Sequence, residues 1–90
     1  MDNQSFKMQI EDSFKIMGRG VVVTGTIENG VVRKGDFVYV GNNGPYNVKG
    51  IEVFRKLLEQ AYSGMKVGLL ISTIEKNDAI KGEYVTSEIK

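Results

Sequence analysis

The amino-acid sequence predicts an all-β fold, a small antiparallel β-barrel. Short runs of β-branched and aromatic residues recur along the 90-residue chain, and such residues suit the pleated surface of a sheet. Glycine-containing turns separate these runs at intervals that suit strands but not helices, most clearly across residues 18–36. About seven short strands joined by such turns are typical of a small barrel.

The first strand is expected over residues 6–10, where apolar side chains alternate with polar ones at the period of a strand with one buried face. The same apolar spacing continues at Phe14 and Ile16. We therefore expect the chain to turn or bulge near residues 11–12 and then to re-enter the sheet.

The strongest strand and turn signals follow. Residues 21–27 form a mainly β-branched run, expected to be a strand in which Gly25 marks a bulge or a close backbone approach. The dipeptide Asn29–Gly30 is the one most typical of a hairpin turn. A second turn is expected at residues 34–36, before a strand over residues 37–40.

Residues 41–45 are expected to form an exposed loop, because Pro45 cannot donate a hydrogen bond to a strand ladder. A further strand is expected over residues 46–54, with a possible bulge at Gly50. Residues 55–60 are too few for a stable independent helix, so they are expected to extend this strand or to form one turn.

The last third of the chain predicts two more strands. A turn at residues 63–64 precedes an apolar strand over residues 67–74, which is expected near the centre of the core. Residues 77–82 are expected to form a short helical turn. Residues 84–86 are then expected to close the domain.

Composition narrows the possible functions. Twelve Lys and Arg against 11 Asp and Glu give a formal net charge of +1, so any RNA contact has to come from a local patch. The chain has no cysteine and no histidine, which excludes a disulfide framework, a thiolate metal site, a cysteine nucleophile and a histidine base. No metal and no cofactor are expected. No secretory signal or membrane span is visible, so a cytoplasmic protein without membrane contact is expected.

Several short motifs occur in one order along nearly the whole chain from Phe6 onward. They lie at residues 10–12, 14, 18–20, 23–25, 27–28, 30, 34–36, 50–58, 61, 64, 67–70 and 80–82. Together they resemble the second domain of translational GTPases, most closely that of bacterial elongation factor Tu. The resemblance implies a β-barrel of the translation-factor type, which follows a GTP-binding domain and, in elongation factor Tu, helps to hold the aminoacylated 3′ end of transfer RNA.

The GTP-binding domain itself is not expected here, because no G-x-x-x-x-G-K-[ST] motif occurs in the 90 residues. Residues 18–20, Gly-Arg-Gly, are expected to form a turn between strands and not a phosphate-binding loop. Residues 1–90 are thus expected to form one domain, with an ordered core over about residues 5–88. Arg19 and Lys34 are interpreted as surface charges on turns.

The resemblance also implies a binding site. The terminal adenine of transfer RNA would lie beside Glu52 and against three aliphatic side chains, Ile16, Val22 and Leu70. An apolar slot accepts the face of a base, and a carboxylate can contact the sugar or the base edge. The residues themselves allow another interpretation, because three aliphatic residues are ordinary in a barrel core and Glu52 fits simple strand alternation.

Arg55, Lys56 and Lys66 complete the RNA-binding candidates. Arg55 and Lys56 resemble a basic pair beside the aminoacyl end, where an arginine holds a phosphate or carboxylate through two parallel hydrogen bonds. A solvated charged edge is the alternative. Lys66 stands where some members of the family carry an asparagine, and Thr26 replaces a basic residue. The resemblance therefore supports the fold of this chain more strongly than it supports the ligand contacts.

Two functions therefore remain open. The leading hypothesis is a noncatalytic module that binds transfer RNA, through its aminoacylated 3′ end, or ribosomal RNA. The alternative is a protein-interaction module that keeps the barrel without RNA binding, with a GTPase-domain protein as one partner. An enzyme is not expected, because no pair of carboxylate, lysine, tyrosine or hydroxyl groups occurs at a sequence spacing that indicates a catalytic site.

Overall fold

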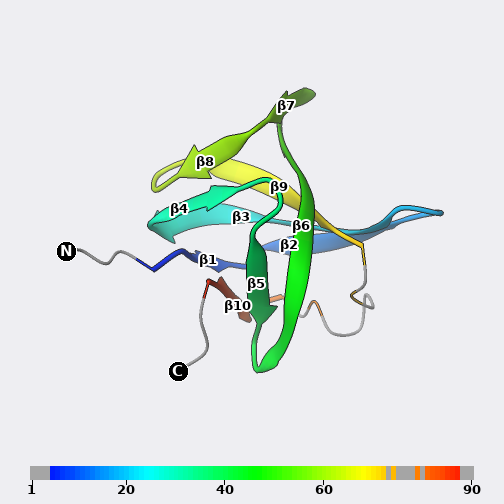
Figure 1. The fold of residues 1–90 in the computed structure, drawn as a ribbon, viewed down its shortest axis with the longest axis horizontal. Coiled ribbons are helices and arrows are strands. Elements are labelled where there is room, and N and C mark those ends of the chain that lie inside the picture. The colour runs from blue at the N-terminus through cyan, green and yellow to red at the C-terminus, as the bar shows by residue number, and fades with distance from the viewer. Residues whose placement is uncertain (1–4, 73, 75–78, 80, 88–90) are drawn as a thin grey trace.

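The computed structural model describes residues 5–72, 74, 79 and 81–87, and these residues form ten β-strands and no helix (Figure 1). In this part of the chain, no helix is therefore present that could cross a membrane. The strands are β1 (Lys7–Gln9), β2 (Asp12–Ile16), β3 (Gly20–Asn29), β4 (Val31–Arg33), β5 (Phe37–Val40), β6 (Asn43–Val53), β7 (Lys56–Leu58), β8 (Gln60–Tyr62), β9 (Lys66–Ile71) and β10 (Tyr84–Thr86).

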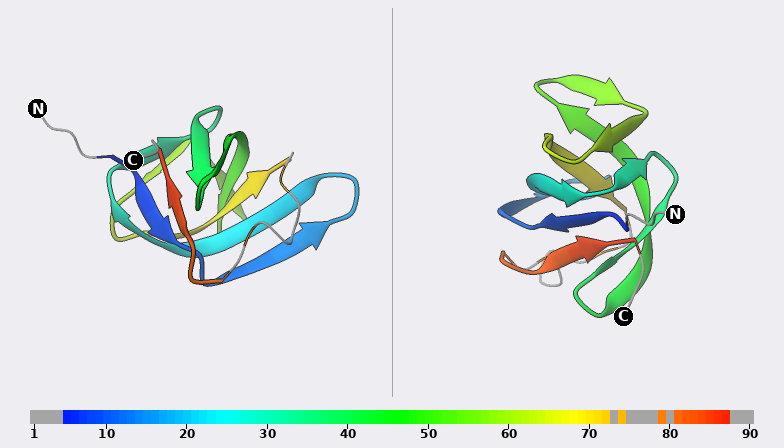
Figure 2. Two further views of the ribbon diagram at one scale, coloured as in Figure 1. Left: turned by 90° about the horizontal axis from the view of Figure 1, so that it is seen from below. Right: turned by 90° about the vertical axis from the view of Figure 1, so that its left-hand side faces the viewer.

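Six of these strands close into an antiparallel barrel in the order β1, β10, β5, β6, β9 and β3, with β3 pairing back to β1 (Figure 2). Two hairpins extend from this ring, since β2 pairs with β3 and β7 pairs with β6. The β4–β8 pair forms a separate two-stranded sheet. The prediction of an all-β antiparallel barrel is therefore confirmed.

The core lies inside the ring and follows the period-two alternation of the strands. On β9, Val67, Leu69 and Ile71 are buried, whereas Gly68 and Leu70 are only half-buried because they point to the outer surface. The expectation of a central strand over residues 67–74 is confirmed, although β9 itself ends at Ile71. No charged or polar residue is buried among the described residues.

The core-packing interpretation of Ile16, Val22 and Leu70 is wrong. All three lie on the outer faces of their strands, where Val22 and Leu70 are half-buried and Ile16 is 36% exposed. The sequence did not decide this point, because a β-branched run such as residues 21–23 contains no polar residue to mark its solvent face.

Gly25 marks a close backbone approach. Strand β3 pairs with β2 up to Thr24 and with β1 from Ile27, and Gly25 lies between these two pairings. A Cβ atom at this position would overlap the carbonyl oxygen of Gln9. The register of β3 with β9 is continuous through Gly25, so the alternative of a bulge is excluded on that side.

Two predictions about connections between strands are wrong, the first in which strands pair and the second in the residue bounds of a loop. The chain bends at Gly30, but the following strand β4 pairs with β8 and not with β3, so Asn29–Gly30 does not close a hairpin. The expected loop over residues 41–45 is shorter, because β6 already begins at Asn43. A register shift between Val38 and Val40 places Pro45 outside the regular ladder, which explains how a strand tolerates it.

Residues 55–60 do not extend β6, and only Arg55 takes part in a turn, because residues 56–58 form the new strand β7. The chain reverses at Phe54 and Arg55, which both have positive φ (46° and 70°), and β7 returns along β6 with Lys56 opposite Val53. Such a turn ordinarily uses asparagine and glycine, so a Phe-Arg pair gives no turn signal.

The remaining expectations have mixed outcomes. The turns at residues 34–36 and 63–64 are confirmed, and a register shift between Val48 and Gly50 confirms the bulge near Gly50. Strand β10 is confirmed at Tyr84–Thr86. Most of the helical turn expected over residues 77–82 lies outside the described residues.

Candidate nucleic-acid interface

The outer face of strands β2, β3, β9 and β6 gathers the predicted binding residues. The register places Val22 opposite Phe14 on one side and Leu70 on the other, and Leu70 opposite Gly50. The next outward-facing row runs from Thr24 through Gly68 to Glu52. Side chains from the consecutive strands β2 and β3 and from the more distant strands β6 and β9 therefore share one surface.

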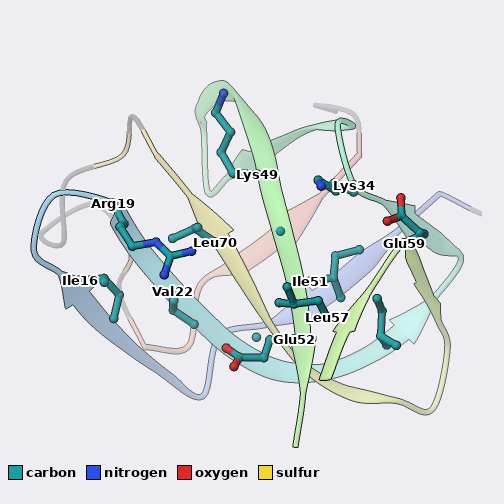
Figure 3. A pocket seen from close by; sticks show the side chains of 13 residues that line it. Ile16, Arg19, Val22, Lys34, Lys49, Ile51, Glu52, Leu57, Glu59 and Leu70 are labelled. Carbon is teal, nitrogen blue, oxygen red and sulfur yellow. The ribbon is translucent and has the colours of Figure 1, made fainter. Parts of the chain in front are cut away.

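A pocket of about 320 Å³ opens on this face (Figure 3). It is lined by Ile16, Arg19, Val22, Lys34, Lys49, Gly50, Ile51, Glu52, Leu57, Leu58, Glu59, Gly68 and Leu70. The structure thus brings the four residues of the expected adenine slot, Ile16, Val22, Glu52 and Leu70, into one pocket. This volume is within the range of small-ligand sites.

Two glycines keep the pocket open. A Cβ atom on Gly68 would lie 3.1 Å from Cγ1 of Val22, and one on Gly50 would lie 4.0 Å from Cβ of Leu70. Any side chain larger than hydrogen at Gly68 would therefore project into the space beside Val22. The absence of these side chains creates a recess on a surface that strand residues would otherwise fill.

A second, more open pocket of about 340 Å³ adjoins the first and shares Ile16, Val22, Glu52 and Gly68 with it. Its further lining residues are Phe14, Thr24, Phe54 and Arg55. Arg55 is therefore close to the predicted slot, and its position depends on the tight β6–β7 turn. The candidate site is a pair of adjoining recesses.

Lys56 and Lys66 do not line either pocket. Lys56 is exposed on β7. Lys66 forms an ion pair with Glu11, with Nζ 3.3 Å from a carboxylate oxygen, and both side chains are largely exposed. An exposed pair of this kind contributes little to stability, so Lys66 remains available to exchange Glu11 for another anion.

Sequence reasoning missed three cations at the first pocket, Arg19, Lys34 and Lys49. From the sequence alone, Arg19 and Lys34 are interpreted as surface charges on turns, and nothing in the local sequence places them in one pocket with Leu70 and Glu52. One signal was available for Arg19, because flanking glycines fix a tight turn at the end of the strand that carries Ile16.

The chemistry of the site follows from these residues. The lining includes the apolar side chains of Val22, Leu70 and Leu57, and it carries three cations and the two carboxylates Glu52 and Glu59. Apolar surface suits the face of a base, and the cations suit a polyanion. Among the described residues, no three Asp or Glu side chains are grouped closely enough to hold a metal ion.

Comparisons with known proteins agree with this architecture. Residues 20–86 match the family model described as elongation factor Tu domain 2. The chain is also similar to the crystal structure of translation elongation factor SelB from Methanococcus maripaludis in its apo form, with 34% sequence identity and a TM-score of 0.87. That match covers 98% of this chain but only 20% of the elongation factor.

Proposed function

This chain belongs to the elongation factor Tu domain 2 family, and on that premise we propose that its outer pocket binds the aminoacylated 3′ end of transfer RNA. The domain 2 barrel of translational GTPases is a noncatalytic unit, and we extend that role to this chain as a whole. Transfer RNA is the preferred partner and ribosomal RNA the second. Such partners place the protein in the cytoplasm.

One observation carries the proposal. Ile16, Val22, Glu52 and Leu70 come from four different strands, yet they line one recess that the glycines leave open. Core packing would have turned the aliphatic side chains inward, and it would not have required a carboxylate beside them. Apolar side chains beside a single carboxylate are suited to bind an unstacked nucleotide at the end of an RNA strand.

The cations support an RNA ligand over a neutral one. Arg19, Lys34 and Lys49 line the pocket, and Arg55 lines its neighbour. None of the four belongs to an ion pair with a described carboxylate. A local cluster of unpaired cations attracts a phosphate backbone even though the chain as a whole has a formal net charge of only +1.

Glu52→Ala is expected to weaken binding of aminoacylated transfer RNA about tenfold, the loss of one charge-assisted hydrogen bond. Binding can be measured by titrating labelled transfer RNA at low salt. Glu59→Ala is the matched control, because Glu59 also lines the pocket but lies apart from Ile16 and Val22 (Figure 3). Removing either carboxylate reduces electrostatic repulsion of the RNA, which by itself would raise the affinity. A lower affinity of the Glu52 variant therefore requires a specific contact between Glu52 and the RNA.

Arg55→Ala is expected to weaken the same complex, and comparison of aminoacylated with deacylated transfer RNA reports whether the aminoacyl end is recognised. Absence of saturable binding by the unmodified protein at low salt would refute the proposal. So would binding that neither the Glu52 nor the Arg55 variant changes.

A protein-interaction module is the second candidate, favoured by three exposed apolar side chains on the two hairpins. Met17, Phe54 and Leu57 are 89%, 93% and 82% exposed. Large apolar side chains that are this exposed can serve as contacts for a protein partner. Saturable binding to a GTP-binding domain, together with no RNA binding, would favour this candidate, whereas recovery of nucleic acid alone from a pull-down would count against it.

A further inference from the structure

Arg19 lies in the turn between β2 and β3 and lines the first pocket. Gly18 and Gly20 on either side of it have φ values of +75° and +131°, and the N–H of Arg19 donates a hydrogen bond to the carbonyl oxygen of Ile16 at 2.9 Å. A Cβ atom on Gly20 would lie 2.5 Å from the carbonyl oxygen of Ile71. Substitution at Gly20 is therefore blocked, and the backbone that carries Arg19 is packed against β9.

The guanidinium group of Arg19 is directed into the pocket. Figure 3 shows it extending toward the space between Leu70 and Val22, whereas Lys49 extends away from these side chains. No ion pair holds Arg19 within the described part of the chain. The guanidinium plane thus lies beside aliphatic side chains without a carboxylate partner.

This placement distinguishes two roles that a pocket cation can have. A contact with a phosphate outside the apolar lining suits a charge that is directed away from that lining, as Lys49 is in Figure 3. A planar, weakly hydrated guanidinium beside an apolar lining is suited to stack on the face of a base. Lysine has no planar group and cannot replace arginine in the second role.

We propose that Arg19 covers the base in the pocket, stacking its guanidinium on the face that the aliphatic lining leaves open, and that this contact favours a purine over a pyrimidine. The inference rests on the proposed function, because it names a residue that selects the base in the same pocket. A purine presents the larger face to the guanidinium. Glu52, on the far side of Val22 in Figure 3, is then left to contact the sugar or the base edge.

The test compares two trinucleotide RNAs, CCA and CCC, by titration into the nitrogen-15-labelled protein at low salt, followed by NMR. The unmodified protein is expected to bind CCA several-fold more tightly than CCC. Arg19→Ala is expected to reduce the affinity for CCA about tenfold, within the range for loss of one stacked base, and to reduce CCC binding much less. Arg19→Lys is expected to lose the preference for CCA as well.

Lys49→Ala is the matched control, because it removes one pocket cation and is expected to weaken CCA and CCC equally. Unchanged resonances from the barrel core establish that each variant is folded. If Arg19→Ala weakens both RNAs equally, or if Arg19→Lys keeps the preference, the stacking role is wrong while the proposed function stands. If the unmodified protein binds neither trinucleotide, this inference fails, whereas the proposed function is decided separately by the titration with aminoacylated transfer RNA.

Discussion

Gly25→Ala is expected to lower the free energy of unfolding by about 3 kcal/mol, the upper part of the usual range for overpacking. The new methyl group would overlap the carbonyl oxygen of Gln9, a backbone atom that cannot move without displacing β1. Strand β1 closes the ring, since it pairs with both β3 and β10. For a domain of this size the melting temperature is expected to fall by roughly 12–24 °C.

Thermal and urea unfolding followed by circular dichroism measure this effect. Gly50→Ala is the control, because Gly50 also lies within a strand. A Cβ atom added there would have Cβ of Leu70 as its nearest neighbour, at 4.0 Å, which is an ordinary contact. The control is expected to be neutral or slightly stabilising. Equal stability of the two variants would mean that β1 does not approach Gly25 as closely as the structure indicates.

Gly68→Val is expected to abolish measurable binding of the transfer RNA end, a loss on the order of 100-fold if one stacked base is excluded. Gly68 borders both pockets, so one new side chain narrows both recesses at once. The added Cβ atom meets only a methyl group of Val22, at 3.1 Å, and valine suits a strand. Binding is therefore expected to fall while the barrel remains folded.

Titration with aminoacylated transfer RNA measures the loss, and a thermal melt checks the fold. Thr26→Val is the matched control, because Thr26 pairs with Lys66 on the same outer face but lines neither pocket. It is expected to bind as the unmodified protein does. Full binding by Gly68→Val would show that the RNA contacts a surface other than these two pockets.

Local chemistry explains which elements were predictable. The alternation of residues 6–10 and the apolar run of residues 67–74 each correspond to a strand, because period-two burial leaves a direct trace in the sequence. Glycine correctly predicted the turns in which the backbone adopts a positive φ, as at Gly35 and Gly64. The turn at Phe54 and Arg55 was missed because its positive φ values are imposed by pairing of β6 with β7 and not by residue preference.

By itself, the sequence determined that this chain is an all-β barrel of the elongation factor Tu domain 2 family, and it named Ile16, Val22, Glu52 and Leu70. It did not determine whether those aliphatic side chains point inward or outward, because a run of apolar residues has two faces of equal hydrophobicity. Barrel closure decided that question, since it turned Val21 and Val23 inward and Val22 outward. Only closure also brought Arg19 and Lys49 to the same pocket, because strand pairing joins segments far apart in the chain.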